Sequence, residues 1–380
     1  MKVWNRLLAW LVGALTVIAT MITVASSVAL GQGRVEEPLR SQNSAAQARQ
    51  TEAYWTSERL AKARAHRVTT DFAAESFVER LDSGRSVSAP GRPPSPGSKP
   101  NLSRKLLDDD EMRQSVEEDR LDDETFLPNS FGTLNAHFSS SRIIPSTAGT
   151  AYPFRTVGKL FFTTDTGDAV CSASTISYRI VVTAGHCVHR GSGGTSGFYR
   201  NFMFVPAYRN GTAPFGTWNG SVAVVTNAWA NGGGSVPNAA DYAMLEMADR
   251  NTARIGDVTG FLGWRTNSLN PNHATMLGFP CNFDACAQMH QVAAGAFRNT
   301  VPNNVEYGSD ARGGSSGGPW VRNFGVASSG QDSTMNLVVG VTSYGYASTD
   351  PKVQGASVPD DRWLGLWNAL CARRGRNCAP

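Results

Sequence analysis

The sequence predicts an all-β domain that runs from about residue 143 to the end of the chain. From Ala151 onward, short apolar or alternating runs recur between turns rich in Gly, Asn, Ser and Pro. Many short strands with frequent turns are typical of a β-sandwich or β-barrel. The strands that we expect are Val157–Phe162, Ile180–Thr183, Phe202–Val205, Val222–Val225, Met244–Met247, Thr275–Phe279 and Leu337–Val341.

The C-terminal end predicts one closing helix. Two aspartates, Asp360 and Asp361, can cap a helix N-terminus, and apolar residues repeat after them at helical spacing. These apolar residues are Trp363, Leu364, Trp367 and Leu370.

The first part of the chain differs from the rest in charge. Residues 30–145 carry 34 charged side chains in 116 positions, whereas residues 146–380 carry 30 in 235. Before them, a short positive region leads into an apolar run with a small-residue cleavage site at Ser27-Val28-Ala29. We therefore expect a signal peptide at 1–29. The alternative is a retained membrane anchor, for which the apolar run is long enough.

Residues 30–142 are interpreted as a pro-region or linker that is partly disordered when isolated. The stretch from Gln42 to about Leu81 is rich in Ala, Glu and Arg and can be helical. Pro90–Gly97 has the composition of a linker. The alternative is a permanent stalk that holds the domain at 143–380 away from a membrane.

The six cysteines, an even number, favour disulfides in an exported chain. Their spacing favours pairs between neighbours in the sequence. Free buried thiols or a metal site are the alternatives, but because no Cys-x-x-Cys occurs we expect no zinc. The expected pairs are Cys171–Cys187, Cys281–Cys286 and Cys371–Cys378.

Three segments predict a nucleophile, a base and an orienting carboxylate. Ser316 lies in the glycine-walled turn Gly313–Trp320, where an attacking hydroxyl has free space. His186 follows an apolar strand in a tight Ala-Gly turn, and Asp241 opens another apolar strand, where a carboxylate must be paired to be buried. A serine, a histidine and an aspartate in these settings indicate a serine peptidase.

The same turn predicts an oxyanion hole. The N–H groups of Gly314 and Ser316 are spaced to converge on one oxyanion, and Ser315 is the rival nucleophile. We expect His189 to be a surface residue. The histidines without a catalytic setting are His66, His137, His189, His273 and His290.

These motifs resemble the chymotrypsin and trypsin clan, and more narrowly the bacterial V8-like glutamyl endopeptidases. The resemblance covers about 145–370. It implies two perpendicular six-stranded antiparallel β-barrels with the triad in the cleft between them, and a disulfide from Cys171 to Cys187 beside the histidine. The stretches that carry it are Thr183–Cys187, Asp241–Ala243, Gly314–Pro319, Thr150–Arg155 and Pro206–Gly216.

Departures from that group leave the substrate preference open. The resemblance implies that Ser343 and Gly345 bind substrate backbone beside the pocket for the P1 side chain. Glutamyl endopeptidases carry a histidine where this chain has Thr342. Asp310 stands where trypsin keeps its pocket carboxylate, six residues before Ser316. It either binds a basic P1 side chain or has a structural role.

We therefore expect a serine endopeptidase, secreted or periplasmic, that acts on proteins or peptides without a cofactor or metal. We expect a zymogen whose own pro-region is a partner, with the mature chain beginning between about 130 and 146. The net charge of +4 argues against nucleic acid as a partner. A monomer is expected, with no membrane contact once the signal peptide is cleaved. The alternatives are a non-catalytic binding protein or a periplasmic quality-control protease on the same fold.

Overall fold

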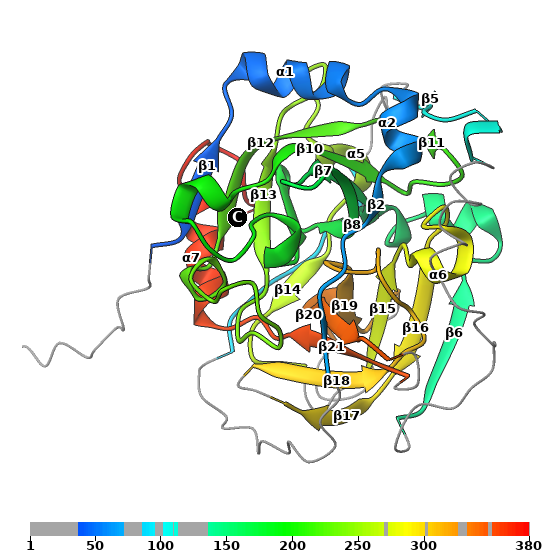
Figure 1. The fold of residues 1–380 in the computed structure, drawn as a ribbon, viewed down its shortest axis with the longest axis vertical. Helices are drawn as coiled ribbons and strands as arrows, with labels where there is room; N and C mark the ends of the chain where they lie inside the picture. The colour runs from blue at the N-terminus through cyan, green and yellow to red at the C-terminus, as the bar shows by residue number, and fades with distance from the viewer. Residues whose placement is uncertain are drawn as a thin grey trace, which may run out of the picture. The chain divides into compact units, whose positions relative to one another are not determined.

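The computed structural model describes residues 37–71, 86–95, 102–108, 110–112, 136–269, 273–300, 303–325, 333–348 and 352–379. Two antiparallel β-sheets dominate this part of the chain (Figure 1). The predicted signal peptide lies outside it, as do residues 130–135, the first part of the stretch in which we expect the mature chain to begin. Among the described residues, no helix has both the length and the apolar character needed to span a membrane.

The first sheet closes into a six-stranded antiparallel barrel. Its order is β12, β10, β7, β8, β9 and β13, and β13 pairs with β12 to complete the ring. The short strand β1 adds to β12, and β2 pairs in parallel with β8. The strands are β1 (Leu39–Gln42), β2 (Arg64–Ala65), β7 (Val157–Thr163), β8 (Asp168–Thr175), β9 (Ile180–Thr183), β10 (Arg200–Pro206), β12 (Trp218–Val225) and β13 (Ala243–Met247).

The second sheet is built around a run of six antiparallel strands in the order β18, β21, β20, β19, β15 and β16, with β17 and β6 at its two ends. β3 and β14 pair in parallel with β20, and β4 pairs with β14. The strands are β3 (Thr69–Thr70), β4 (Ser88–Ala89), β6 (Phe138–Arg142), β14 (Gly263–Arg265), β15 (Ala274–Gly278), β16 (His290–Ala294), β17 (Ala296–Asn299), β18 (Asn304–Gly308), β19 (Pro319–Arg322), β20 (Leu337–Tyr346) and β21 (Val353–Ser357). A separate two-stranded sheet pairs β5 (Arg104–Lys105) with β11 (Thr212–Ala213).

The predicted all-β fold with a C-terminal helix is confirmed, and all seven predicted strands are present within a residue or a few of their expected bounds. Asp360 caps the last helix by accepting a hydrogen bond from the backbone N–H of Arg362. The apolar face of that helix is buried at Trp363, Leu366 and Leu370. The α-helices are α1 (Ala45–Tyr54), α2 (Ser57–Lys62), α4 (Asn227–Ala230), α5 (Ile255–Thr259), α6 (Cys281–Asp284) and α7 (Asp361–Cys371).

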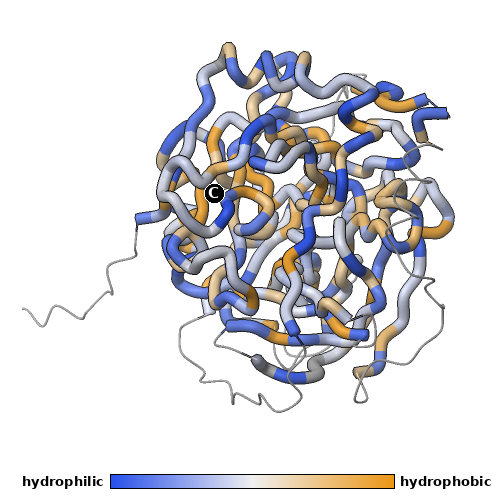
Figure 2. The backbone as a smooth tube through the Cα atoms, viewed as in Figure 1, coloured by the Kyte–Doolittle hydropathy of each residue, from blue (hydrophilic) through white to orange (hydrophobic). Residues whose placement is uncertain are grey.

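The hydrophobic residues follow the two sheets. One buried cluster fills the first barrel and extends to α7, and a smaller one lies within the second sheet. Figure 2 draws the backbone as a tube, and its orange stretches mark apolar residues such as those of these strands. Hydrophilic stretches in blue occur at many of the turns. Burial of the apolar strand faces is the main stabilising contribution to such a fold.

The described part of the expected pro-region packs on the domain. Trp55 is 4% exposed and its indole N–H donates to the carbonyl oxygen of Asn201 at 2.7 Å. The expectation of helix from Gln42 to Leu81 is confirmed for α1 and α2, and residues 72–81 lie outside the described part of the chain. It is wrong for β2 and β3, because the chain there pairs with the edges of both sheets, and this tertiary pairing overrides helix propensity.

Residues 64–70, called the crossing segment below, lead from the first sheet to the second. They contain β2, which pairs with β8, and β3, which pairs with β20. In Figure 1 the blue trace that descends from α2 follows this course.

The three disulfides expected from the spacing of the cysteines are all present. They join Cys171 to Cys187, Cys281 to Cys286 and Cys371 to Cys378.

Candidate active site

His186 and Asp241 are brought together by two neighbouring strands of the first barrel. β9 ends just before the turn that holds His186, and β13 begins two residues after Asp241. The two strands pair, with Thr183 opposite Ala243. Nδ1 of His186 lies 2.7 Å from Oδ2 of Asp241, and the backbone N–H of His186 donates to Oδ1 at 2.8 Å. The carboxylate therefore fixes both the ring and its backbone.

Both side chains are buried, at 1% exposure for His186 and 0% for Asp241. A buried carboxylate is tolerated only where hydrogen bonds satisfy it. Asp241 is satisfied by His186 and by the hydroxyl of Ser343, which donates to Oδ2 at 2.6 Å. Its backbone N–H donates to the hydroxyl of Ser357 at 3.2 Å.

The turn before His186 requires glycine because of close packing. A Cβ on Gly185 would lie 2.7 Å from Cγ of Trp229 and 2.9 Å from Oδ1 of Asp241. Trp229 is held in turn by its indole N–H, which donates to the carbonyl oxygen of His189 at 2.7 Å. The tryptophan therefore forms a fixed wall behind the imidazole.

Ser316 lies on a turn between two residues with left-handed backbone, Gly314 at φ +92° and Gly317 at φ +79°. Such values favour glycine. A Cβ on Gly317 would lie 2.0 Å from Oγ1 of Thr183. The turn is bonded to the first barrel, because the N–H of Ser172 donates to the carbonyl oxygen of Ser316 at 2.7 Å and its hydroxyl donates to that of Gly314 at 2.8 Å.

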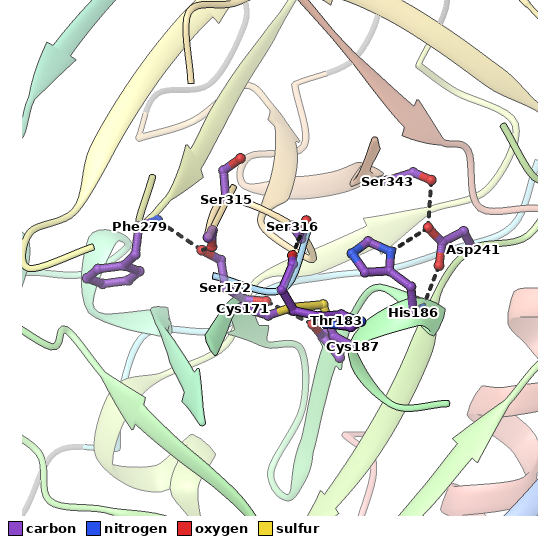
Figure 3. The surroundings of a disulfide bond; sticks show 12 residues. Cys171, Ser172, Thr183, His186, Cys187, Asp241, Phe279, Ser315, Ser316 and Ser343 are labelled. Atoms are coloured by element: carbon purple, nitrogen blue, oxygen red, sulfur yellow. Dashed lines mark hydrogen bonds and ion pairs between the residues drawn. A yellow bond between two sulfur atoms is a disulfide. The ribbon is translucent and has the colours of Figure 1, made fainter. Parts of the chain in front are cut away.

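The two serines of the turn have different surroundings. The hydroxyl of Ser315 donates to the carbonyl oxygen of Arg312 at 2.6 Å and accepts from the side-chain amide of Gln354 at 2.7 Å. Figure 3 shows Ser316 on the side of the imidazole of His186, Ser315 farther from it, and Asp241 beyond the ring. Ser315 is thus engaged in a structural network, whereas Ser316 faces the histidine.

Nε2 of His186 is buried and has no hydrogen-bond partner among the described residues. The hydroxyl of Ser316 instead donates to the carbonyl oxygen of His66 in a long bond of 3.5 Å. No motif around His66 connects it with this site, and from the sequence it is a histidine without a catalytic setting. It lies against the site because the crossing segment passes over it.

The ring of His66 lies next to the candidate base, tilted by 34° from its plane. Its centroid is 5.8 Å from that of His186, and it makes edge contacts with Phe162 and Tyr199, each at 5.6 Å. Burial, with the neighbouring His186 as a second cause, lowers the pKa of His66 to about 4. At neutral pH it is therefore an uncharged ring.

The cleft next to Ser316 holds a pocket bounded by β20, by the turn and by the crossing segment. From residues 143–380 its walls include Arg312, Ser315, Thr342, Tyr344 and Gln354. Gly345, expected to bind substrate backbone, lies in β20 opposite Thr69 of the crossing segment. Ser343 is buried on the same strand, with its side chain turned to Asp241.

Asp310 does not line this pocket. Its side chain is 8% exposed, and Oδ1 has no hydrogen-bond partner among the described residues. Burial raises its pKa, and a hydrogen bond to Ser140 of β6 acts in the opposite direction. Its backbone carbonyl accepts from the side-chain amide of Asn282 at 3.0 Å.

Cys171, His186 and Cys187 are close enough to suggest a metal site. The two sulfurs are joined in a disulfide, however, so they are not the thiolates that a metal would bind.

His189 was expected at the surface, and this is wrong: it is fully buried, with Nε2 2.7 Å from the carbonyl oxygen of Gly194. The loop closes over it because both ring nitrogens have backbone partners.

Comparison with known proteins agrees with this geometry. The family model described as Trypsin matches residues 143–362, more than half of the chain. The chain belongs to the trypsin family. Among curated proteins, it is 29% identical over 173 residues to a glutamyl endopeptidase of Bacillus licheniformis, covering 45% of this chain and 49% of that one.

Two further relatives of this trypsin-family chain are informative. A Bacillus subtilis protein named extracellular metalloprotease is 25% identical over 180 residues, with 46% of this chain and 54% of that one covered. The chain spans about half the length of the curated relatives it matches. The crystal structure of a thermostable serine protease, AL20, from an extremophilic microorganism matches at 28% identity with a TM-score of 0.51. That match covers 58% of this chain and 98% of the other.

Proposed function

We propose that the chain is an exported serine endopeptidase in which Ser316 attacks the peptide carbonyl. His186 takes the proton of the Ser316 hydroxyl and returns it to the leaving amine. Asp241 holds the imidazole in one tautomer and stabilises its charged form. The observation that carries this proposal is the buried pair of Asp241 and His186 beside a serine on a glycine turn.

The oxyanion would be stabilised by the backbone N–H groups of Gly314 and Ser316. The left-handed backbone of Gly314 supports this role. A Cβ there would lie 2.4 Å from the carbonyl oxygen of Phe279 and 2.6 Å from Sγ of Cys281. The disulfide from Cys281 to Cys286 would thus brace the turn from behind.

For the substrate, we propose a pocket that does not select basic P1 side chains. Asp310 is absent from its walls, and no carboxylate is among the described residues that line it. A cationic side chain needs an opposite charge where it is desolvated. We therefore assign Asp310 a structural role, bracing the loop that leads to Ser316 against β6.

We also propose that the chain is made as a zymogen and cut before residue 136. β6 pairs with β16 over five residues, so a cut after Arg142 would remove a strand from the second sheet. N-terminal sequencing of the processed protein tests this, and a first residue later than Ala136 would contradict it. Disulfides and the extracellular relative support export.

The test of function compares the unsubstituted processed protein with two variants of it on denatured casein. Ser316→Ala should reduce turnover by at least about a thousandfold, because only binding and the oxyanion hole would remain. Ser315→Ala, the matched control on the same turn, should retain most activity. Loss of activity in Ser315→Ala with full activity in Ser316→Ala would reject the assignment.

A further inference from the structure

We propose that the crossing segment is an inhibitory strand of this chain, and that His66 is the residue that closes the active site. The inference rests on the proposed function, because it concerns how the same site is kept inactive before processing. It names residues 64–70 as the intramolecular partner of the cleft.

The crossing segment is anchored on both sides of the site. Before the site, β2 pairs with β8, and the N–H of His66 donates to the carbonyl oxygen of Val170 at 3.0 Å. After the site, Thr69 lies opposite Gly345 in a parallel pair, and the N–H of Ala347 donates to the carbonyl oxygen of Thr70 at 3.2 Å. Added strands of this kind bind through main-chain hydrogen bonds, as extended peptide ligands do.

This position excludes a substrate from the same place. Gly345 is one of the residues expected to bind substrate backbone, and β3 already pairs there. Arg67 packs on the serine turn, since a Cβ on Gly313 would lie 2.5 Å from two atoms of its side chain. The crossing segment therefore covers both the strand and the turn that a substrate must reach.

The segment also leaves the nucleophile inactive. The hydroxyl of Ser316 points its proton at the carbonyl oxygen of His66, and Nε2 of His186 has no partner. Attack requires that this proton pass to the base. In this arrangement the proton is directed to the segment and not to the base.

Upstream contacts hold the segment in place. Trp55 packs 5.5 Å from Phe161 between ring centroids, and Tyr54 donates to Oδ1 of Asp168 at 2.6 Å. Arg59 adds an ion pair to the same carboxylate at 3.1 Å. The anchored helices make the segment effectively a tethered ligand, which raises its local concentration over the cleft.

The test is the rate at which a fluorophosphonate probe labels Ser316. The full chain is compared with the processed chain that lacks residues before 136. The full chain should react at least about a hundredfold more slowly, as expected for a tethered ligand. His66→Ala in the full chain should react about tenfold faster than the unsubstituted full chain, because one ring contact with the base is lost.

The matched control is Lys62→Ala, a substitution of an exposed residue of α2 outside the cleft, which should label like the unsubstituted full chain. Thr69→Pro supplies a second opening variant, because proline disrupts strand pairing at an exposed position. Equal rates for full and processed chains would overturn the inference, as would a slow full chain that neither variant accelerates. If the processed chain itself fails to react, the proposed function fails instead.

Discussion

The hydroxyl of Ser343 and the ring of His186 share one oxygen of Asp241. Ser343 donates to Oδ2 at 2.6 Å, and Nδ1 of His186 lies 2.7 Å from the same atom. The carboxylate thus has two fixed partners from opposite sheets, one on β20 and one after β9. Both sheets must therefore be correctly placed against each other for the imidazole to be oriented.

Ser343→Ala should therefore lower kcat of the processed enzyme by about tenfold to a hundredfold, with a smaller change in KM. A hydrogen bond to a charged group is worth roughly 1.5–3 kcal/mol. Ser174→Ala is the matched control, since this buried hydroxyl has no partner among the described residues. Steady-state kinetics on one peptide substrate check the prediction. Equal kcat in the two variants would show that Ser343 does not position Asp241.

Gly317→Ala should destabilise the protein by about 2–5 kcal/mol, since left-handed backbone strain and overpacking each contribute roughly 1–3 kcal/mol. The added methyl would meet Oγ1 of Thr183 at 2.0 Å and the carbonyl oxygen of Ser172 at 2.4 Å. Gly149→Ala is the control, because nothing lies within 4 Å of its Cβ position. Urea unfolding measures both. A change below about 1 kcal/mol in Gly317→Ala would contradict the packing described for the turn.

Asp310→Asn should lower kcat/KM by a similar factor for peptides with Arg, Glu or Leu at P1. Asp310 lies outside the pocket and contacts Ser140. Its loss would therefore disturb the loop before Ser316 and lower activity on all substrates, instead of on one class alone. Matched peptides that differ only at P1 provide the measurement. A selective loss of about a hundredfold on the Arg peptide would instead make Asp310 the floor of a basic pocket.

Acid should loosen the crossing segment. The pKa of His66 is lowered from 6.5 to about 4 in the closed chain. The released segment takes up a proton more readily, so closure is fully favourable above about pH 6.5 and weakens as pH falls toward 4. The groups that face His66 are His186, Asp241 and Tyr199. Burial raises the pKa of Tyr199 to about 12, so Tyr199 stays neutral.

Hydrogen exchange in the uncut Ser316→Ala chain measures this loosening without catalysis. The protection of the His66 amide, which bonds to Val170, should fall by up to about two orders of magnitude between pH 7 and 4 after correction for intrinsic exchange. His66→Gln should remove most of the pH dependence. The same pH dependence in both chains would assign the effect to another group.

The proposed catalytic residues could be proposed from the sequence because each stands in a local motif. Asp241, His186 and Ser316 are marked by the turns and strands directly around them in the sequence. The hydrogen bonds of Ser343, Ser357 and Ser172 at the site could not be predicted, since each joins the serine to a partner more than 100 residues away. Such contacts follow from how the two sheets meet, which periodicity and turn chemistry do not encode.

In the expected pro-region, even more of the structure depends on contacts between residues that lie far apart in the sequence. Its composition predicted helix, and α1 and α2 form as expected with Ser44 and Thr56 as side-chain caps. The placement of His66 on His186 depends on free edges of β8 and β20, which lie far along the chain. Only the folded arrangement reveals that His66 contacts the candidate base His186.

The most direct test of the proposed mechanism is the site of covalent modification in the processed chain. After reaction with a fluorophosphonate, peptide mass spectrometry should locate one adduct on Ser316 and none on Ser315, because only Ser316 faces the imidazole while Ser315 is bonded to Arg312 and Gln354. His186→Ala should abolish the adduct, since the hydroxyl would lose its base. An adduct on Ser315, or one on Ser316 that forms equally fast without His186, would contradict the catalytic arrangement.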